Sequence, residues 1–513
     1  MKKKLEIRTF KNFLGISFSK ATGYIRDLLL ASRFGSDSIM DAWALSFQIL
    51  TSLKTALAET PLESISIPAM SKIAADKEKH QSASGSLLTK IVLVLIPTLV
   101  MLSLFSDSIA TFLTAYKPSD IELEMLSSLI KGLLGYVSGA VISIWASCVL
   151  RSQGRMLAAS LTPIILNLSI IACVLFLKKD PIETLTWGAG WGAWIGVVFQ
   201  FYAFGLGKRW PKINWKNKYQ KQFDKRYLEG VGVGIFPSLT LIATRYYATL
   251  LSSGSISWLY YSTRLIQVPN SLIGVCIAQA SLPELSIISK SNFSRELEKA
   301  LRIGFVLAIP MTIYFFFESK FFTELLFQYG KFTNNDTAQV AAIFKILAIS
   351  LPLVISESIL TKACYAKNIH KKLIKIKLIQ FLSCLAFLAF FFYGNLENKL
   401  SAVPASSIIS VSIGVLLLRK EFEIKNKNIF SISKKTKKYL IGIFFFFILF
   451  ELGPFFLGFL SLVAVSFFKD ANWLNTSLMV MTTFLYLGNG LHWLKAAISA
   501  YSILYVWKNE VTK

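Results

Sequence analysis

Histidine is scarce in this chain, and His80, His370 and His492 lie in three distant segments of its 513 residues. A metal cluster or a histidine-based catalytic triad needs several such groups in one site, so the sequence indicates neither. The chain also lacks the GxxxxGK(S/T) loop that cradles nucleotide phosphates, which argues against direct ATP hydrolysis. We therefore expect no metal, no cofactor and no enzymatic activity.

Cysteine is also sparse. The five cysteines stand singly in apolar stretches with no CxxC spacing, which is typical of small buried hydrophobic residues.

Acidic residues are few, because 29 Asp and Glu accompany 55 Lys and Arg, for a formal net charge of +26. In a soluble protein this excess would indicate nucleic-acid binding. Here the basic residues gather beside apolar stretches, with eight in residues 208–226 and eight more in residues 419–438. Such runs mark the cytoplasmic side of a membrane, so we expect no nucleic acid as a partner.

Long hydrophobic stretches make up most of the remainder. Hydrophobic residues are 54% of the chain and aromatic residues 14%. Runs of about 20 apolar residues have the length to cross a bilayer as helices. We predict an all-α polytopic membrane protein with about fourteen spanning helices, at residues 11–34, 41–68, 86–116, 122–150, 158–178, 184–207, 228–252, 262–290, 297–318, 337–364, 371–393, 400–419, 438–466 and 476–506.

The charge distribution predicts the topology. Residues 35–41 and 252–257 are nearly free of positive charge and are expected outside, and both termini are expected in the cytoplasm. No small-residue cleavage site follows the first apolar stretch, so we interpret it as a retained helix and not a signal peptide.

The longest polar connection divides the chain into two halves. Residues 208–227 form a predicted basic cytoplasmic linker between an N-lobe of six helices (1–207) and a C-lobe of six helices (228–420). A linker here is expected if two bundles rock about a central site. Residues 421–513 supply a basic loop and a last helix pair.

Charged residues interrupt the first two predicted spans. Lys20 and Asp27 share one face of a helix with Arg26 beside them, and the second span contains Asp41, Lys54, Glu59 and Glu63. Arg264 lies in a later apolar stretch. Charges at membrane depth are costly unless they face a wet cavity or a partner, so we expect them to line the interior and bind an anion.

Three stretches resemble one family. Residues 255–285 (SISWLYYSTRLIQVPNSLIGVCIAQASLPEL), 23–48 (GYIRDLLLASRFGSDSIMDAWALSFQ) and 325–333 (LLFQYGKFT) are similar to the seventh-to-eighth helix region, the first hairpin and the loop between helices 9 and 10 of the MurJ family. That family comprises bacterial lipid II flippases within a larger group of multidrug and oligosaccharidyl-lipid exporters. The resemblance runs through most of residues 10–420 in order and spacing.

The resemblance implies two six-helix lobes in a V shape, with helices 13 and 14 forming a groove for a polyprenyl tail. It implies the bacterial inner membrane as location and alternating access as mechanism. The expected partners are membrane lipids and lipid II, or a related polyprenyl-pyrophosphate glycolipid such as an O-antigen or exopolysaccharide precursor. We expect a monomer, alone or with cell-wall synthesis proteins.

The family's essential cationic positions correspond to Lys20, Arg26, Lys54 and Arg264, with Asp41 as an acidic neighbour. Two of these positions hold lysine here instead of arginine, which keeps the charge but loses the bidentate fork that suits a phosphate.

The resemblance adds one more position to the substrate-binding set, and the spans supply further candidates. Gln267 stands where the family has an acid one turn after the helix-8 arginine. Asp27, Glu59 and Arg245 are additional cavity candidates.

Several of these residues also have structural interpretations. In these interpretations, Arg26 and Asp27 form only an intramembrane ion pair and Asp41 only caps the start of a helix. Lys54 only extends its charged end to the membrane–water interface. For the whole protein, a drug or cation exporter and a membrane scaffold without transport stay open, although an exporter of cations is expected to have a cavity dominated by carboxylates.

Some family members bind sodium between helices 7 and 11 through carboxylate and Asn oxygens. Residues 371–393 here contain no Asp, Glu or Asn, and helix 7 carries Arg245. We hypothesise that Arg245 supplies a fixed positive charge in place of sodium, the alternative being that Arg245 pairs with Glu357.

Transport by the wild-type protein is then expected to be independent of sodium, and transport by Arg245→Ala to require it, as measured in sodium-free and sodium-containing buffers. Sodium dependence of the wild type would contradict the hypothesis.

Overall fold

The computed structural model describes residues 2–62, 70, 73–74, 76–114, 120–153, 155–177, 179–206, 210–212, 220–275, 277–278, 290–394 and 399–424. Every regular element in these ranges is a helix, and seven of them are long and apolar enough to cross a membrane. The all-α prediction is confirmed, whereas the count of fourteen spans stays a prediction. Glu63, helices 13 and 14 and the proposed tail groove lie outside the described residues.

The N-lobe contains the helices of residues 2–206. They are α1 (Lys2–Phe34), α2 (Ser38–Lys54), the π-helical segment η1 (Thr55–Glu59), α4 (Lys77–Leu104), α5 (Ser106–Leu113), α6 (Asp120–Gly132), α7 (Leu134–Ser152), α8 (Met156–Phe176) and α9 (Pro181–Leu206).

The C-lobe contains the helices of residues 220–421. They are α10 (Gln220–Thr249), α11 (Ser255–Pro269), the π-helical segment η3 (Asn270–Val275), α13 (Lys290–Phe317), α14 (Ser319–Phe327), α15 (Asn334–Ala366), α16 (His370–Tyr393), the short 3₁₀ turn η4 (Lys399–Ser401) and α17 (Ala402–Glu421). Because α10 begins at Gln220, the last part of the predicted linker is helical.

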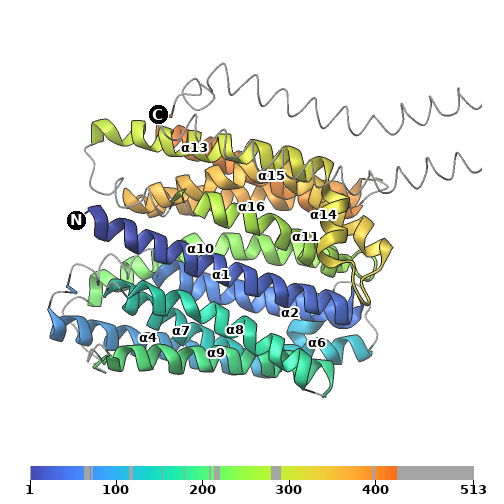
Figure 1. The fold of residues 1–513 in the computed structure, drawn as a ribbon, viewed down its shortest axis with the longest axis horizontal. Coiled ribbons are helices and arrows are strands. Elements are labelled where there is room, and N and C mark those ends of the chain that lie inside the picture. The colour runs from blue at the N-terminus through green and yellow to red at the C-terminus, as the bar shows by residue number, and fades with distance from the viewer. Residues whose placement is uncertain are drawn as a thin grey trace, which may run out of the picture.

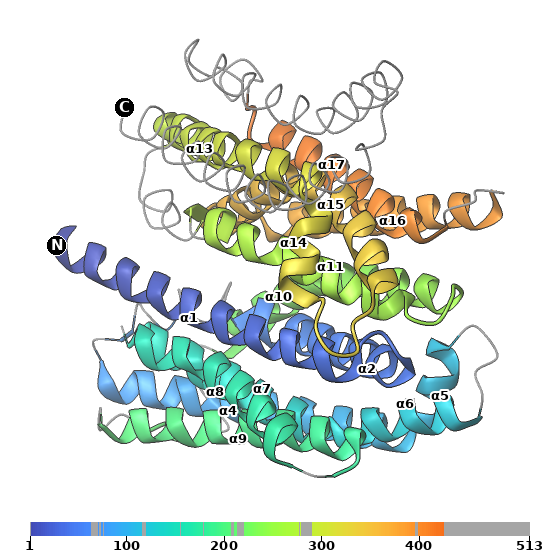
Figure 2. The same cartoon turned by 45° about the vertical axis from the view of Figure 1, so that its right-hand side comes forward.

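The two lobes form two groups of roughly aligned helices, with α1, α2, α10 and α11 along their boundary (Figures 1 and 2). Within the N-lobe, α9 packs closely on α8 through glycines. A Cβ atom built on Gly192 would lie 2.8 Å from the Cα atom of Leu166, so only glycine permits this approach. Small residues that let two backbones approach are common where membrane helices pack on one another.

The second helix of each lobe passes into a π-helical segment, α2 into η1 and α11 into η3. The hydroxyl of Ser238 on α10 donates a hydrogen bond to the backbone oxygen of Ser52 at 2.9 Å, and the hydroxyl of Tyr227 donates to that of Leu57. These bonds tie α10 of the C-lobe to α2 and η1 of the N-lobe along one flank of the boundary.

Following the predicted topology, we call the ends that carry residues 35–37, 250–254 and 328–333 the outer ends of the lobes. There the carboxylate of Asp41 accepts hydrogen bonds from the backbone N–H groups of Gly254 and Ser257, at 2.7 and 2.8 Å, and from the Ser257 hydroxyl at 2.5 Å. Asp41 on α2 therefore caps α11, a helix of the other lobe.

A second group of bonds joins the outer ends. The hydroxyl of Ser36 in the N-lobe donates to Asp336 at the start of α15 in the C-lobe. The indole N–H of Trp258 holds the same carboxylate from within the C-lobe, at 2.8 Å. The backbone N–H of Lys331 donates to the Ser32 oxygen at 2.8 Å. Gly330, with φ +62°, lies so close to Ser32 that a Cβ atom would be 2.2 Å from its backbone oxygen. The lobes are thus joined at their outer ends.

Asp41→Ala removes three hydrogen bonds between the lobes and is expected to favour separation of the outer ends. Hydrogen bonds to a charged group contribute roughly 1.5–3 kcal/mol each. The probe is a cysteine that replaces Thr263, which lines the cavity between the lobes. In the Asp41→Ala variant this cysteine is expected to react with an impermeant thiol reagent added outside at least about tenfold faster than in the protein that keeps Asp41. The measurement uses a chain whose five natural cysteines are replaced by alanine.

Asp37→Ala provides the matched control, because Asp37 caps α2 within its own lobe by accepting a hydrogen bond from the backbone N–H of Met40 at 3.1 Å. Equal labelling rates in the two variants would show that Asp41 does not hold the outer ends together.

Candidate functional site

A buried cluster joins α1 to α11 near the middle of the boundary. The Arg26 guanidinium contacts Asp27 through Nη2 at 2.6 Å, and the Arg264 Nε lies 3.4 Å from the other oxygen of the same carboxylate. The Tyr260 hydroxyl donates to Asp27 at 2.9 Å. One carboxylate is therefore shared by two arginines from two lobes, which leaves the cluster with a net positive charge.

Arg26 is fixed within the N-lobe. Its side chain is 8% exposed, and its Nη1 donates to the Asn167 Oδ1 on α8 at 2.9 Å. The Asn167 amide in turn donates to the backbone oxygen of Ser19 and the hydroxyl of Thr22, both at 3.2 Å. The structural interpretation of Arg26 and Asp27 as an intramembrane ion pair thus describes their contacts correctly.

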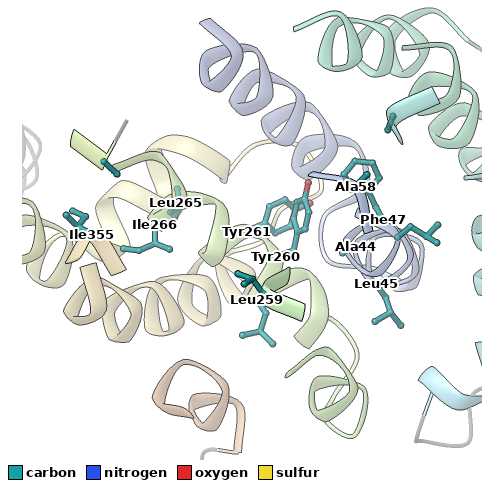
Figure 3. Packing of buried hydrophobic residues seen from close by; sticks show 14 of the residues in the cluster. Ala44, Leu45, Phe47, Ala58, Leu259, Tyr260, Tyr261, Leu265, Ile266 and Ile355 are labelled. Atoms are coloured by element: carbon teal, nitrogen blue, oxygen red, sulfur yellow. The ribbon is translucent and has the colours of Figure 1, made fainter. Parts of the chain in front are cut away.

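Arg264 is held more loosely than Arg26. Its side chain is 28% exposed, its guanidinium lies 4.6 Å above the Tyr260 ring, and its Nη1 donates to Gln267 at 3.1 Å. Tyr260 and Tyr261 lie between Leu265 of α11 and Phe47 of α2 (Figure 3). This packing fixes the base of Arg264 and leaves its charged end beside a cavity.

The cavity lies between the lobes and has a volume of about 390 Å³. Arg245, Arg264 and Lys377 supply its cations, and its described lining contains no Asp or Glu. The other polar groups are hydroxyls and amides, from Gln48, Thr51, Ser52, Thr55, Thr60, Ser238, Tyr260, Thr263, Gln267, Thr361 and Tyr365. Such walls suit an anion that also carries many hydrogen-bonding groups.

Arg245 lines this cavity and is buried. Its Nε donates to the Gln48 Oε1 of α2 at 2.5 Å. Glu357 instead pairs with Lys377 and accepts a hydrogen bond from Gln380. The alternative in which Arg245 pairs with Glu357 is therefore wrong, because Lys377 and Gln380 of α16 hold that carboxylate.

Lys54 and Glu59 lie in a different place. They line a second cavity of about 170 Å³ inside the N-lobe, with Tyr136, Arg151 and Thr162. The Lys54 Nζ is 3.9 Å from the Glu59 carboxylate. Residues five apart face each other because η1 has π-helical i→i+5 bonding. The Lys54 side chain thus lies inside the N-lobe and does not extend to the membrane–water interface.

The remaining predicted residues are distributed along the boundary. Gln267 lines the central cavity, and Asp41 lies at the outer end as the cap of α11. Lys20 is half-buried on α1 and interacts electrostatically with Arg264, Asp27, Arg26 and Glu59. The structure thus brings Arg26, Asp27 and Arg264 together, with Lys20 nearby, and places Asp41 apart.

Sequence reasoning missed three residues of the site. Tyr260 stands one turn before Arg264, a spacing that puts both side chains on one helix face. This spacing could have identified Tyr260 as a neighbour of Arg264 in the site. Lys377 follows Lys371, Lys372 and Lys375 at the start of α16, and such a basic run is typical of a cytoplasmic membrane boundary rather than of a site. Asn167 stands alone in an apolar stretch and gives no signal without its partner Arg26.

Comparison with known proteins gives a consistent result. A family model described as lipid II flippase MurJ matches residues 30–467. The "Probable lipid II flippase MurJ" of Buchnera aphidicola subsp. Schizaphis graminum is 31% identical over 362 residues, 68% of this chain and 70% of that protein. The "Lipid II flippase MurJ" of Burkholderia cenocepacia is 26% identical over 376 residues, 70% of this chain and 72% of that protein.

Solved structures show the same fold. "Lipid II flippase MurJ, inward closed conformation" covers 99% of both chains with a TM-score of 0.74 at 19% identity. A transporter of the MOP superfamily from Pyrococcus furiosus covers 82% of this chain and 96% of its own, with a TM-score of 0.62 at 14% identity.

Proposed function

Because this chain belongs to the MurJ family of lipid II flippases, we propose that it moves lipid II from the inner to the outer leaflet of the bacterial cytoplasmic membrane. Lipid II is a peptidoglycan precursor in which a pyrophosphate joins a glycopeptide to an undecaprenyl chain. The observation that carries the proposal is the cavity between the lobes, which has three cations and, in its described lining, no acid.

Arg264 is the residue that we expect to receive the pyrophosphate. Its side chain is 28% exposed, and its N–H groups now contact Asp27, Gln267 and Tyr260. A guanidinium binds phosphate oxygens through two parallel N–H bonds, which the pyrophosphate takes over from these partners. Arg245 lines the same cavity and adds a second fixed charge. Together they replace part of the hydration that the anion loses when it enters the protein.

Cargo binding also changes the contact between the lobes. A pyrophosphate oxygen on Arg264 competes with Asp27, whose contact to Arg264 is already long at 3.4 Å. A ligand shifts a conformational equilibrium by its different affinity for the two states. We therefore propose that the anion weakens this link, after which the outer contacts of Asp41 and Asp336 open and the lobes rock outward to release the headgroup.

No covalent step is needed in this cycle. Charged residues that move across the membrane potential gain about 2.3 kcal/mol per charge per 100 mV, which is one way to give the cycle a direction. The proposal includes cytoplasmic termini, the inner membrane and a monomer that acts alone or with cell-wall synthesis proteins.

A second candidate cargo is another polyprenyl-linked oligosaccharide, such as an O-antigen or exopolysaccharide precursor. Lys20, Lys54 and Gln267 favour it, because each departs from the residue expected in the lipid II flippases. The pyrophosphate is common to both cargoes, so the choice depends on the rest of the headgroup.

Complementation of a strain depleted of its lipid II flippase tests the function. The wild-type chain is expected to restore growth, and Arg264→Ala at equal expression to fail, because losing a charged hydrogen-bonding group slows transport by roughly ten- to a hundredfold. Arg264→Lys is expected to rescue partially, since it keeps the charge without the fork.

Lys320→Ala is the control, because this lysine side chain is 74% exposed on α14 and away from the cavity. Rescue by Arg264→Ala would assign the arginine a structural role. Failure of the folded, membrane-inserted wild type would favour the second cargo.

A further inference from the structure

A second cationic position lies in the C-lobe wall of the central cavity. Lys377 on α16 lines the cavity and forms an ion pair with Glu357 on α15, the two side chains being 11% and 15% exposed. The Gln380 amide donates to the same Glu357 oxygen at 2.8 Å and also to the Ser410 backbone oxygen of α17 at 3.2 Å. The pair is enclosed by the lobe and open to the cavity on one side.

This position is distant from the arginines along the helices. Lys377 lies roughly 10 Å from the inner start of α16, at 1.5 Å per residue. Arg264 lies roughly 13 Å from the outer start of α11, and Arg245 only about one turn from the outer end of α10. Thr361 and Tyr365, near the inner end of α15, line the cavity beside Lys377. The cavity thus has arginines toward its outer end and a lysine toward its inner end.

We propose that Lys377 is a subsite for a carboxylate on the cargo headgroup, separate from the pyrophosphate contact at Arg264; this rests on the proposed function. An ammonium is a compact charge on a flexible stem, which suits a single carboxylate. Glu357 shows that a carboxylate fits against this ammonium. A cargo carboxylate then replaces Glu357 as the ion-pair partner of Lys377, so the ammonium exchanges one carboxylate for another.

Gln380 makes this exchange feasible. When the ammonium turns to the cargo, the Gln380 amide still donates to Glu357, so the displaced carboxylate keeps a hydrogen-bond partner. Gly414 on α17 leaves the space that Gln380 occupies, since a Cβ atom there would be 1.9 Å from the Gln380 amide nitrogen. The subsite therefore selects a glycopeptide with free carboxylates over a headgroup of neutral sugars.

Binding to the purified full-length chain tests the subsite with two probes. One is an undecaprenyl-pyrophosphate disaccharide that carries a peptide with free carboxylates, and the other has the same peptide with its carboxylates amidated. Wild type is expected to bind the free-carboxylate probe roughly tenfold more tightly than the amidated one. Lys377→Gln is expected to remove that difference by weakening only the free-carboxylate probe.

Two further variants separate binding from folding. Glu357→Gln removes the internal competitor and is expected to tighten binding of the free-carboxylate probe several-fold while leaving the amidated probe unchanged; a structural role of the ion pair predicts no such gain. Lys372→Gln is the matched control, because Lys372 also lies on α16 but pairs with Glu421 and is 61% exposed.

Equal affinity of the wild type for both probes, or equal weakening of both by Lys377→Gln, overturns the subsite and leaves the transport function intact. Failure of the folded wild type to bind either probe overturns both proposals.

Discussion

One buried carboxylate, that of Asp27, lies where the two lobes meet, and the site depends on it. Arginine cannot lose its charge, and at membrane depth its burial costs several kcal/mol unless a partner or water compensates. Asp27 compensates Arg26 closely, at 2.6 Å, and Arg264 only partly, at 3.4 Å. Because its contact to Asp27 is the shorter one, Arg26 is a fixed part of the N-lobe. Arg264, with the longer contact, is left available to an anion.

The helix that carries Arg264 couples the centre of the protein to its outer end. Asp41 caps the start of α11, and Arg264 lies roughly 13 Å further along the same helix. A displacement of α11 that frees it from Asp41 therefore also changes the separation of Arg264 and Asp27. One rigid element thus links the proposed cargo contact at Arg264 to the outer contacts, as the proposed alternating-access cycle requires.

The fold and the charge pattern were readable from the sequence because span length and basic runs are local signals. The grouping of Arg26, Asp27 and Arg264 was partly predictable, since each is expensive alone in an apolar stretch. The positions of Lys54 and Glu59 could not be predicted, because helix periodicity assumes α-helical turns and the π-helical η1 changes which side they face.

Asp41 looked like a cap of its own helix, and only the tertiary structure shows that it caps α11. Lys377 was obscured by the neighbouring lysines that mark the membrane boundary.

The most direct measurement is the affinity of the purified protein for undecaprenyl pyrophosphate, in wild type and in Asp27→Asn. If Asp27 competes with the anion for Arg264, the neutral isostere is expected to bind roughly tenfold more tightly. Asp107→Asn, whose carboxylate is 75% exposed on α5, is expected to bind like the wild type. Unchanged or weaker binding by a folded Asp27→Asn protein would contradict the account, because Asp27 would then not be the partner that the cargo replaces.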